Sequence, residues 1–236
     1  AQRKIKKLNI SGGLRYDYRN INSSEMHDGV TVKFEAFKKQ YSNISASAGF
    51  TYEFPAGVLF RFNLARGFRA PNMAELGSNG AHEGTNRYEV GNNDLHSEKS
   101  FQVDAGVEFN TEHLSLAASF FNNSINQYIY FEKTASVGGG DSIVTVGTDD
   151  FYLFRFVQQN ANLYGMELSF DIHPHPLDWL HFESSFSFVR GLLSSPIEGN
   201  RNIPFIPAAR VLSELRFDLF QKQKKLLKNT YFKIEL

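Results

Sequence analysis

Apolar and polar side chains alternate along most of this chain, and this pattern limits the possible folds most strongly. In residues 100–110 the odd positions are apolar, from Phe101 to Phe109, while the even positions include Gln102, Asp104 and Glu108. Successive side chains of a β-strand point to opposite faces, whereas a helix would place apolar residues three and four apart. The segment is therefore predicted to be a strand with one apolar and one polar face.

The same alternation recurs in eight further segments, at residues 8–18, 44–54, 58–64, 114–120, 164–172, 180–188, 211–219 and 230–236. Tight links at 55–57, 111–113 and 173–178 contain turn-forming residues. Longer polar segments separate the other strands, and we expect them to be loops: 19–42, 67–97, 132–149 and 191–206. The sequence thus predicts an all-β protein, an antiparallel up-and-down meander of about nine strands.

Composition excludes several classes of protein. Basic and acidic residues balance at 25 each, which argues against a nucleic-acid partner, because such proteins need a basic excess to neutralise phosphates. The chain has no cysteine, so disulfides, thiol nucleophiles and cysteine zinc sites are impossible. No apolar run is long enough for a transmembrane helix. The basic start of the chain lacks the apolar segment of a signal peptide.

Two architectures fit strands with one apolar face: a soluble sandwich, or an outer-membrane barrel whose apolar face meets lipid. The predicted strands approach the length of roughly 9 to 11 residues that crosses a bilayer, and aromatic residues gather near their ends, as in membrane-interface girdles. Short turns on one side and long loops on the other also favour the barrel. Nine is an odd number, whereas bacterial single-chain barrels use even numbers, so we expect residues 1–236 to be part of a larger barrel.

Several motifs, in consistent order, resemble those of the TonB-dependent receptors of Gram-negative outer membranes. The residues that carry the resemblance are Gly67-Phe68-Arg69-Ala70-Pro71, Glu75-Leu76, Asn92-Asn93-Asp94-Leu95 with Glu98, Asn160 with Gly165-Met166-Glu167-Leu168, and Ile203-Pro204-Phe205-Ile206-Pro207 with Arg210. Asn93 stands where the family usually has proline, and His96-Ser97 replace the usual pair before the glutamate. The spacing of the boxes is kept.

This resemblance implies a transmembrane barrel of roughly 22 strands enclosing a plug domain. It also implies an outer-membrane active-transport receptor that imports an iron complex (siderophore or haem) or a metal nutrient, driven by the TonB–ExbB–ExbD complex acting on the plug. The plug and the terminal strands are not expected within residues 1–236. The partners implied are the lipid bilayer and a small-molecule or metal ligand. No cofactor is expected, since a ferric complex, haem or zinc would be the transported ligand.

Candidate ligand-binding residues lie in the predicted loop at 67–97. His82 and Glu83 combine an imidazole and a carboxylate that can bind zinc, iron or a haem edge, and His96 is a further candidate. The alternative for His82 is a histidine that supports a turn. Arg69 and Glu75, with Arg66, could contact an anionic ligand, but we favour lumen-side ion pairs that hold the loop, because buried charges must be paired.

Other readings remain open. His173 and His175 alternate with prolines, so we interpret them as a rigid turn rather than a metal pair. A soluble all-β ligand-binding or structural domain is the main alternative function. An outer-membrane barrel hydrolase is a weaker one, since the chain has no nucleophile motif of the Gly-x-Ser-x-Gly kind. We therefore do not expect an enzyme.

Overall fold

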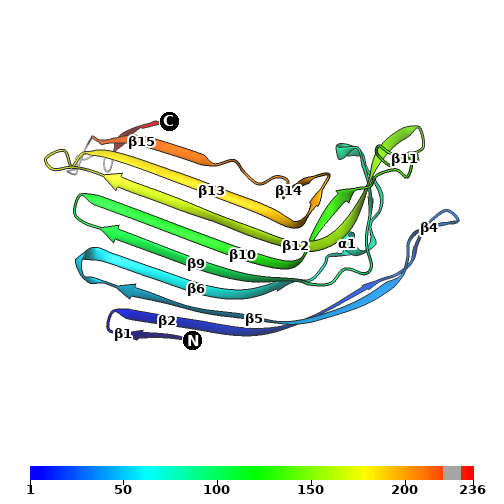
Figure 1. Ribbon diagram of the computed structural model, residues 1–236, viewed down its shortest axis with the longest axis horizontal. Helices are drawn as coiled ribbons and strands as arrows, with labels where there is room; N and C mark the ends of the chain where they lie inside the picture. Colours follow the sequence, from blue (N-terminus) through cyan, green and yellow to red (C-terminus); the bar gives the residue numbers. More distant parts are fainter. Residues whose placement is uncertain (220–229) are drawn as a thin grey trace.

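The computed structural model describes residues 1–219 and 230–236 and is dominated by one large sheet (Figure 1). Its main strands neighbour one another in chain order, and every neighbouring pair along this path is antiparallel. They are β1 (Gln2–Ile5), β2 (Leu8–Ser23), β5 (Phe37–Glu53), β6 (Val58–Arg69), β9 (Glu98–Asn110), β10 (Leu114–Lys133), β12 (Asp149–Ile172), β13 (Leu180–Ile197), β15 (Arg210–Asp218) and β16 (Tyr231–Glu235). The predicted all-β meander is confirmed.

Each of the nine predicted segments lies within one strand or extends beyond that strand by at most one residue at an end. The main path has ten strands where about nine were predicted, and the additional one is β1, which pairs with β2 although its largely basic, exposed residues show no apolar face. Backbone pairing with β2 and an exposed ion pair between Lys4 and Glu53 (3.7 Å) hold this edge strand, and an alternation search does not detect it. The odd count therefore no longer applies to the described residues, in which β1 and β16 are the two edges of the sheet.

All four predicted long loops are shorter than expected, since strands continue into them. The largest difference is at 19–42, where β2 runs to Ser23 and β5 begins at Phe37. A bulge explains why the alternation ends within β10, before the predicted loop at 132–149: Gln127 has a φ of 59°, and the pairing shifts between Ile125 and Tyr128. A bulge puts two residues opposite one and breaks the alternation, while backbone pairing continues on both sides of it.

Small elements gather at the end of the sheet opposite the tight turns (Figure 1). These are the hairpin β3 (Met26–Asp28) and β4 (Thr31–Phe34), helix α1 (Met73–Gly77), β7 (Asn79–His82), β8 (Arg87–Val90), β11 (Ile143–Val146) and β14 (Asn200–Asn202). Strand β8 pairs with β7 and lies parallel to β12. The 3-10 turn η2 (Glu83–Thr85) lies between β7 and β8, whereas the 3-10 turn η1 (Pro55–Gly57) forms the tight turn between β5 and β6 at the other end of the sheet. Among the described residues, no helix is long and apolar enough to cross a membrane.

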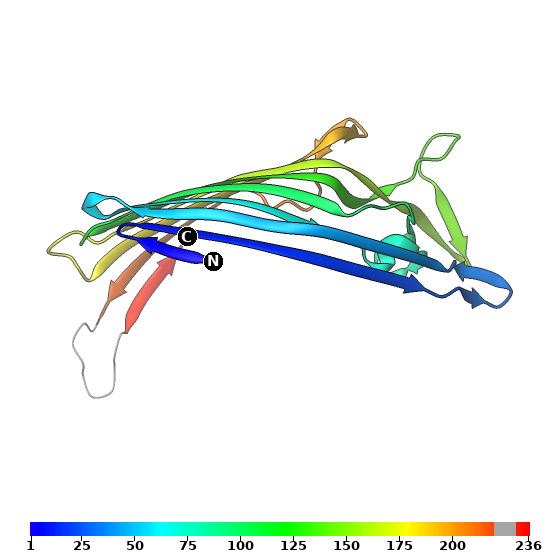
Figure 2. The same cartoon turned by 90° about the horizontal axis from the view of Figure 1, so that it is seen from below.

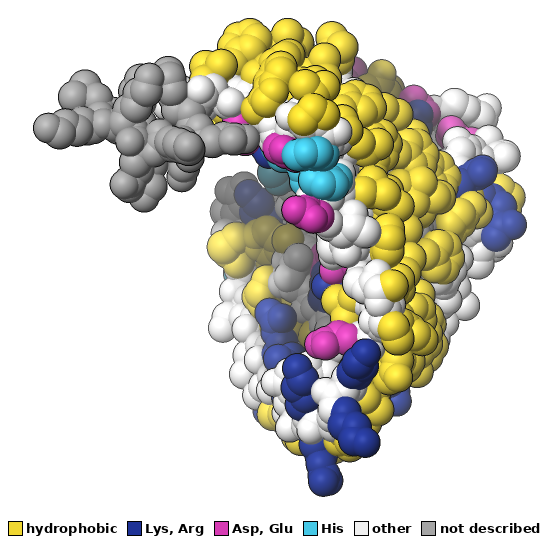
Figure 3. All heavy atoms as spheres, turned by 90° about the vertical axis from the view of Figure 1, so that its left-hand side faces the viewer, with side chains coloured by type: hydrophobic (Ala, Val, Ile, Leu, Met, Phe, Trp, Pro, Cys, Tyr) yellow, Lys and Arg dark blue, Asp and Glu magenta, His cyan; other side chains and the backbone are white. Residues whose placement is uncertain are grey.

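The sheet is curved (Figure 2), and its two faces differ in chemistry, as the alternation predicts (Figure 3). Phenylalanines from neighbouring strands meet on one face: the rings of Phe50 and Phe60 lie 5.8 Å apart, and those of Phe170 and Phe182 lie 5.5 Å apart. Several of these rings are exposed, Phe120 by 50%. In Figure 3, hydrophobic side chains cover one side of the sheet, while charged side chains lie on the other side.

Most buried side chains lie toward the long-loop end rather than along the middle of the sheet. One cluster joins Leu76 of α1 to Ile21, Leu95 and Ile129, so it packs the helix against β2 and β10. A second cluster consists of Ala161, Leu193 and Ile203. The long-loop end is therefore the part of the molecule with a conventional hydrophobic core, and the candidate ligand residues are attached to it.

Candidate ligand-binding site

A short helix follows the end of β6 and is fixed by its own first turn. Asn72 caps α1 by accepting a hydrogen bond from the Glu75 N–H (2.8 Å), and the Glu75 carboxylate accepts one from the Asn72 N–H (2.8 Å). This reciprocal pair is a capping box, which satisfies two backbone donors that a helix start leaves free. Pro71 precedes it and is fully buried. The predicted loop therefore begins as an ordered turn.

Arg69 connects this turn to the sheet. Its guanidinium donates to both oxygens of Glu75 (2.8 and 2.9 Å) and to both oxygens of Glu98 in β9 (2.8 and 2.6 Å). Both glutamates are only 8% exposed, and Glu98 also accepts the Ile129 N–H at 2.7 Å. Such two-oxygen contacts are the strong form of an arginine–carboxylate pair. Arg69 and Glu75 thus form the internal ion pair that the sequence favoured.

Arg66 does not join this arrangement, so the prediction of a lumen-side ion pair is wrong for this residue. It is an even-numbered residue of β6, on the same face as Phe60 and Phe62, while Arg69 is odd-numbered and lies on the opposite face. Arg66 is exposed and forms no ion pair with any described residue. Arg66 and Arg69 are three residues apart in the motif, and in a strand this odd spacing puts their side chains on opposite faces of the sheet.

His82 ends β7, in the hairpin that β7 forms with β8. Its side chain is 66% exposed, and its Nε2 atom lies 4.0 Å from one oxygen of Glu89. The other oxygen of Glu89 lies 3.5 Å from Arg87. Glu83 begins η2, and its side chain lies outside the described part of the structure. The metal contact by His82 remains a prediction. The neighbouring carboxylate that the structure identifies is Glu89.

His96 is exposed and its backbone holds it in place. Its N–H donates to Gln158 (2.8 Å), and its carbonyl oxygen accepts from the same side chain (2.8 Å). It borders an open hollow of about 690 Å³ that Lys39, Tyr41 and Asp94 also line. The structure brings Arg69 and Glu75 together but leaves His82 and His96 at separate places in the loop region.

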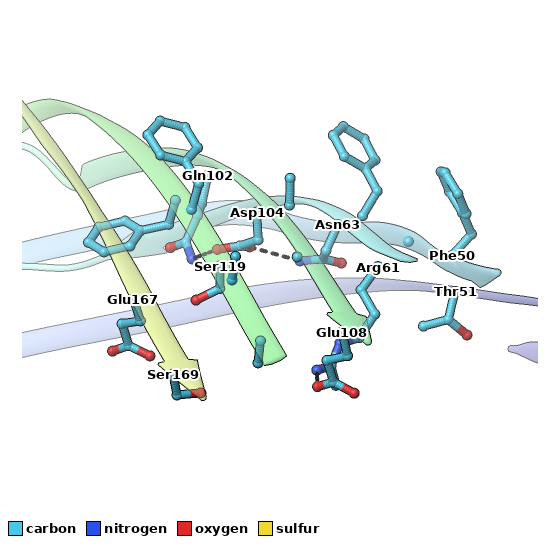
Figure 4. Close-up of a pocket in the computed structure, with 18 of the residues that line it drawn as sticks. Phe50, Thr51, Arg61, Asn63, Gln102, Asp104, Glu108, Ser119, Glu167 and Ser169 are labelled. Atoms are coloured by element: carbon cyan, nitrogen blue, oxygen red, sulfur yellow. Dashed lines mark hydrogen bonds and ion pairs between the residues drawn. The ribbon is translucent and has the colours of Figure 1, made fainter. Parts of the chain in front are cut away.

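An open hollow of about 1000 Å³ lies on the polar face, over the middle of the strands (Figure 4). Arg61 pairs with Glu108 across β6 and β9, and Asp104 accepts hydrogen bonds from Asn63 (3.3 Å) and Gln102 (2.6 Å). In Figure 4, Phe50 points away from these polar groups. The alternation in the sequence already separates the polar side chains that line this hollow from the apolar side chains of the opposite face. This surface was therefore recognisable from the sequence.

A cluster of histidines at the tight-turn end was missed. His173 and His175 lie in the turn between β12 and β13, as predicted. However, the structure also brings His113 and His181 next to them: the rings of His173 and His181 are 4.6 Å apart, and those of His113 and His173 are 5.8 Å apart. The only available signal was the strand register, which joins positions far apart in the sequence.

Comparison with known proteins now identifies the fold. The family model described as "TonB dependent receptor-like, beta-barrel" matches residues 1–220. The chain belongs to this TonB-dependent receptor family. Transferrin-binding protein A of Neisseria meningitidis serogroup B is 30% identical over 122 residues, which are 52% of this chain and 12% of that protein. The chain therefore spans about an eighth of the length of this curated relative.

Solved structures of receptors in this family share the fold. The copper transporter OprC superposes with a TM-score of 0.69 at 17% identity, over 91% of this chain and 30% of that one. A Serratia marcescens hemophore receptor, HasR, solved with its hemophore and heme, superposes with a TM-score of 0.65 at 12% identity, over 90% of this chain and 39% of that one. These relatives are receptors and transporters, not enzymes, in agreement with the sequence prediction.

Proposed function

We propose that this chain forms a sector of the barrel of an outer-membrane receptor that imports an iron complex, such as a ferric siderophore or haem, or a metal nutrient. The family match over residues 1–220 is the observation that carries the proposal. Its relatives are named for transferrin, copper and heme, which all concern metals or metal complexes. In this proposal TonB, ExbB and ExbD supply the energy through a plug that the sector surrounds.

The arrangement of the side chains supports this role. Exposed phenylalanines on one face suit contact with lipid, and the hollow on the other face is lined by polar groups, including Asp104, Arg61 and Glu108. Arg69 holds the α1 turn to β9, which gives the external loops a fixed base. The proposed membrane location is the outer membrane of a Gram-negative bacterium, with the tight turns on the periplasmic side.

Within this receptor, His82 is the proposed ligand contact, with Glu83 and His96 as further candidates. Its exposed imidazole lies beside Glu89, and a histidine with a carboxylate suits zinc, iron or a haem edge. Arg69 and Glu75 have the supporting role, because each Glu75 oxygen already accepts from Arg69.

Uptake by cells that carry the complete receptor tests the import proposal. Radiolabelled zinc, haem iron and ferric siderophores are supplied to cells with and without the receptor, and to cells that also lack TonB. We expect accumulation of one of these substrates that requires both proteins. Receptor-dependent accumulation that persists without TonB would contradict the energy source, and no accumulation of any of them would contradict the import of these substrates.

Calorimetric titration of the complete receptor with zinc, haem and ferric siderophores tests the role of His82. The His82→Ala variant should bind the transported ligand more weakly, while His27→Ala is a matched control, since His27 is another exposed loop histidine, with its Nε2 atom 2.6 Å from Glu25. If His82→Ala left every affinity unchanged, the ligand contact by this residue would be refuted.

A further inference from the structure

The tight-turn end of the sheet carries a concentration of imidazole and carboxylate groups on its polar face (Figure 3). Four of the seven histidines lie there, in two groups that each include an aspartate. One group is Asp171, His173 and His181, and the other is His113, His175 and Asp178. In each group, the possible ligand atoms lie within 4.8 Å of one another. This cluster is separate from the loops that carry His82.

The first group is assembled by strand geometry. Asp171 and His173 are two residues apart at the end of β12, so their side chains share the polar face. Ile172 pairs with Phe182, so His181, which directly precedes Phe182 in the chain, lies opposite His173 on that same face. His181 is only 9% exposed, although it is near the rim of the sheet. The three side chains therefore converge from two strands onto one partly buried point.

Distances within this group fit a small metal ion. The Nδ1 atom of His181 lies 3.1 and 3.2 Å from the oxygens of Asp171, and the Nδ1 atom of His173 lies 3.7 Å from one of them. Two ligands that are about 2.0–2.1 Å from a tetrahedral zinc ion are separated by roughly 3.3–3.4 Å. The observed separations lie on both sides of this value, so small side-chain rotations would complete the coordination.

The outer ring nitrogens of both histidines face oxygen atoms. The Nε2 atom of His173 lies 2.6 Å from the carbonyl oxygen of Glu112, to which it donates its proton. The Nε2 atom of His181 lies 3.6 Å from Asp218, whose other oxygen pairs with Arg216 at 3.3 Å. Histidines that bind a metal usually donate the opposite N–H to a carbonyl or carboxylate, which orients the ring and leaves the other nitrogen free to coordinate.

A purely structural ion cluster explains these contacts less well. A protonated His181 between Asp171 and Asp218 would account for that histidine alone. It leaves the Nδ1 atom of His173 buried without a hydrogen-bond partner, whereas buried polar atoms are satisfied in the large majority of cases. A metal ion between the two Nδ1 atoms and the carboxylate would satisfy all three groups at once.

We propose that Asp171, His173 and His181 bind one divalent transition-metal ion of the zinc type at the tight-turn rim, on the polar face. Two imidazoles and a carboxylate are a donor set that suits zinc. The hydrogen bond to Glu112 orients the ring of His173, and Asp218 lies 3.6 Å from the outer nitrogen of His181. Such an ion would join the end of β12 to the start of β13. The inference does not rest on the import proposal, because none of its residues belongs to the long-loop end.

The second group serves as an internal comparison. His113 and His175 lie 3.5 and 3.1 Å from Asp178, so its separations are similar. The Nδ1 atom of His113, like that of His173, is buried without a hydrogen-bond partner. However, the side chain of His175 is 72% exposed, and among the described residues this group has no counterpart of the hydrogen bond from His173 to the carbonyl oxygen of Glu112. The first group is therefore the better organised site.

Titration of the complete receptor with zinc chloride, after removal of metal by a chelator, tests the proposal. Asp171→Asn and His181→Gln should each weaken one zinc site by more than roughly 100-fold, and Asp218→Asn should weaken it roughly 10- to 100-fold, as loss of an orienting partner does. His175→Ala and His82→Ala should leave this site unchanged. Cobalt at the same site should give the strong visible absorption of four-coordinate Co²⁺, and Asp171→Asn should remove it.

Thermal unfolding and circular dichroism establish that each variant is folded before its affinity is compared. The proposal is overturned if folded Asp171→Asn and His181→Gln bind zinc as the unchanged receptor does, or if the receptor binds no zinc at this end. It is equally overturned if His175→Ala alone abolishes the site. Loss of binding in His82→Ala alone would concern the external ligand contact, so the two proposals fail in distinguishable ways.

Discussion

Arg69 provides the strongest single test of how the long-loop end of the sheet is held. Replacement by alanine removes four charge-assisted hydrogen bonds, two to Glu75 and two to Glu98. It leaves two carboxylates facing each other on side chains that are only 11% exposed. Glu98 keeps the Ile129 N–H and Glu75 keeps the Asn72 N–H, so each retains one partner. We expect the α1 turn to detach from the sheet more often.

The size of the effect follows from the burial of the three groups. Removal of one partner from a fully buried ion pair costs about 3–5 kcal/mol. The Arg69 side chain is 42% exposed, so water already screens part of the interaction and the value must be lowered. We expect a loss of about 2–3 kcal/mol in the free energy of local opening, which corresponds to roughly 30- to 150-fold more frequent opening.

Amide hydrogen exchange measures this opening directly. The Asn92 N–H donates to the Glu75 carbonyl (2.8 Å) and the Gly91 N–H to the Ser78 carbonyl (2.7 Å), so both amides report whether the turn is closed. Arg61→Ala is the matched control, because Arg61 also pairs with a glutamate of β9 but is exposed, and an exposed pair contributes about 0–1 kcal/mol. The reasoning is refuted if exchange at Asn92 is no faster in Arg69→Ala than in Arg61→Ala.

Two further predictions concern the packing of the sheet and its two faces. Gly165→Ala would place a Cβ atom 2.6 Å from the ring of Phe121 and against the carbonyl oxygen of Phe188, so we expect a loss of about 1–3 kcal/mol, seen as a lower thermal midpoint. Phe120→Arg should cost about 2–4 kcal/mol in membrane-inserted protein if its exposed ring meets the bilayer midplane, whereas the neighbouring Ser119→Arg points into the hollow and should be tolerated. Equal stability of these two arginine variants in folding assays with lipid vesicles would contradict the lipid-facing assignment.

The strands were predictable wherever one face is continuously apolar. Residues 101–109 and 164–172 alternate without interruption, and both lie within strands. The alternation fails where pairing no longer depends on an apolar face: β1 is held by backbone bonds, and the bulge at Gln127 shifts the pattern. Loop lengths were therefore overestimated, because the absence of alternation does not mean the absence of a strand.

The candidate site was predictable in part. The motif spacing indicated the Arg69 ion pair, but it could not reveal that Glu98 is the second partner, since that contact depends on the pairing of Arg69 with Glu98 between β6 and β9. The histidine cluster was hidden for the same reason. The pairing of Leu114 with Ile172 brings His113 and His173 together across β10 and β12, although they lie 60 positions apart in the chain. Register, which periodicity alone does not determine, decides both cases.

The two polar assemblies lie at opposite ends of the same strands. From Leu114, beside the histidine cluster, to Ile129, which donates to Glu98, β10 rises by about 3.3 Å per residue, so the ends are about 50 Å apart. The hydrocarbon core of a bilayer is about 30 Å thick. Strands of transmembrane barrels tilt by about 35–45°, so a separation of about 50 Å along the strand is roughly 35–40 Å along the bilayer normal. In the proposed orientation the two assemblies therefore lie on opposite sides of that core, outside the band of exposed phenylalanines. An ion bound at Asp171 could stabilise the rim without meeting the external ligand, and any passage between the two ends would follow the polar face through the hollow lined by Arg61, Asp104 and Glu108.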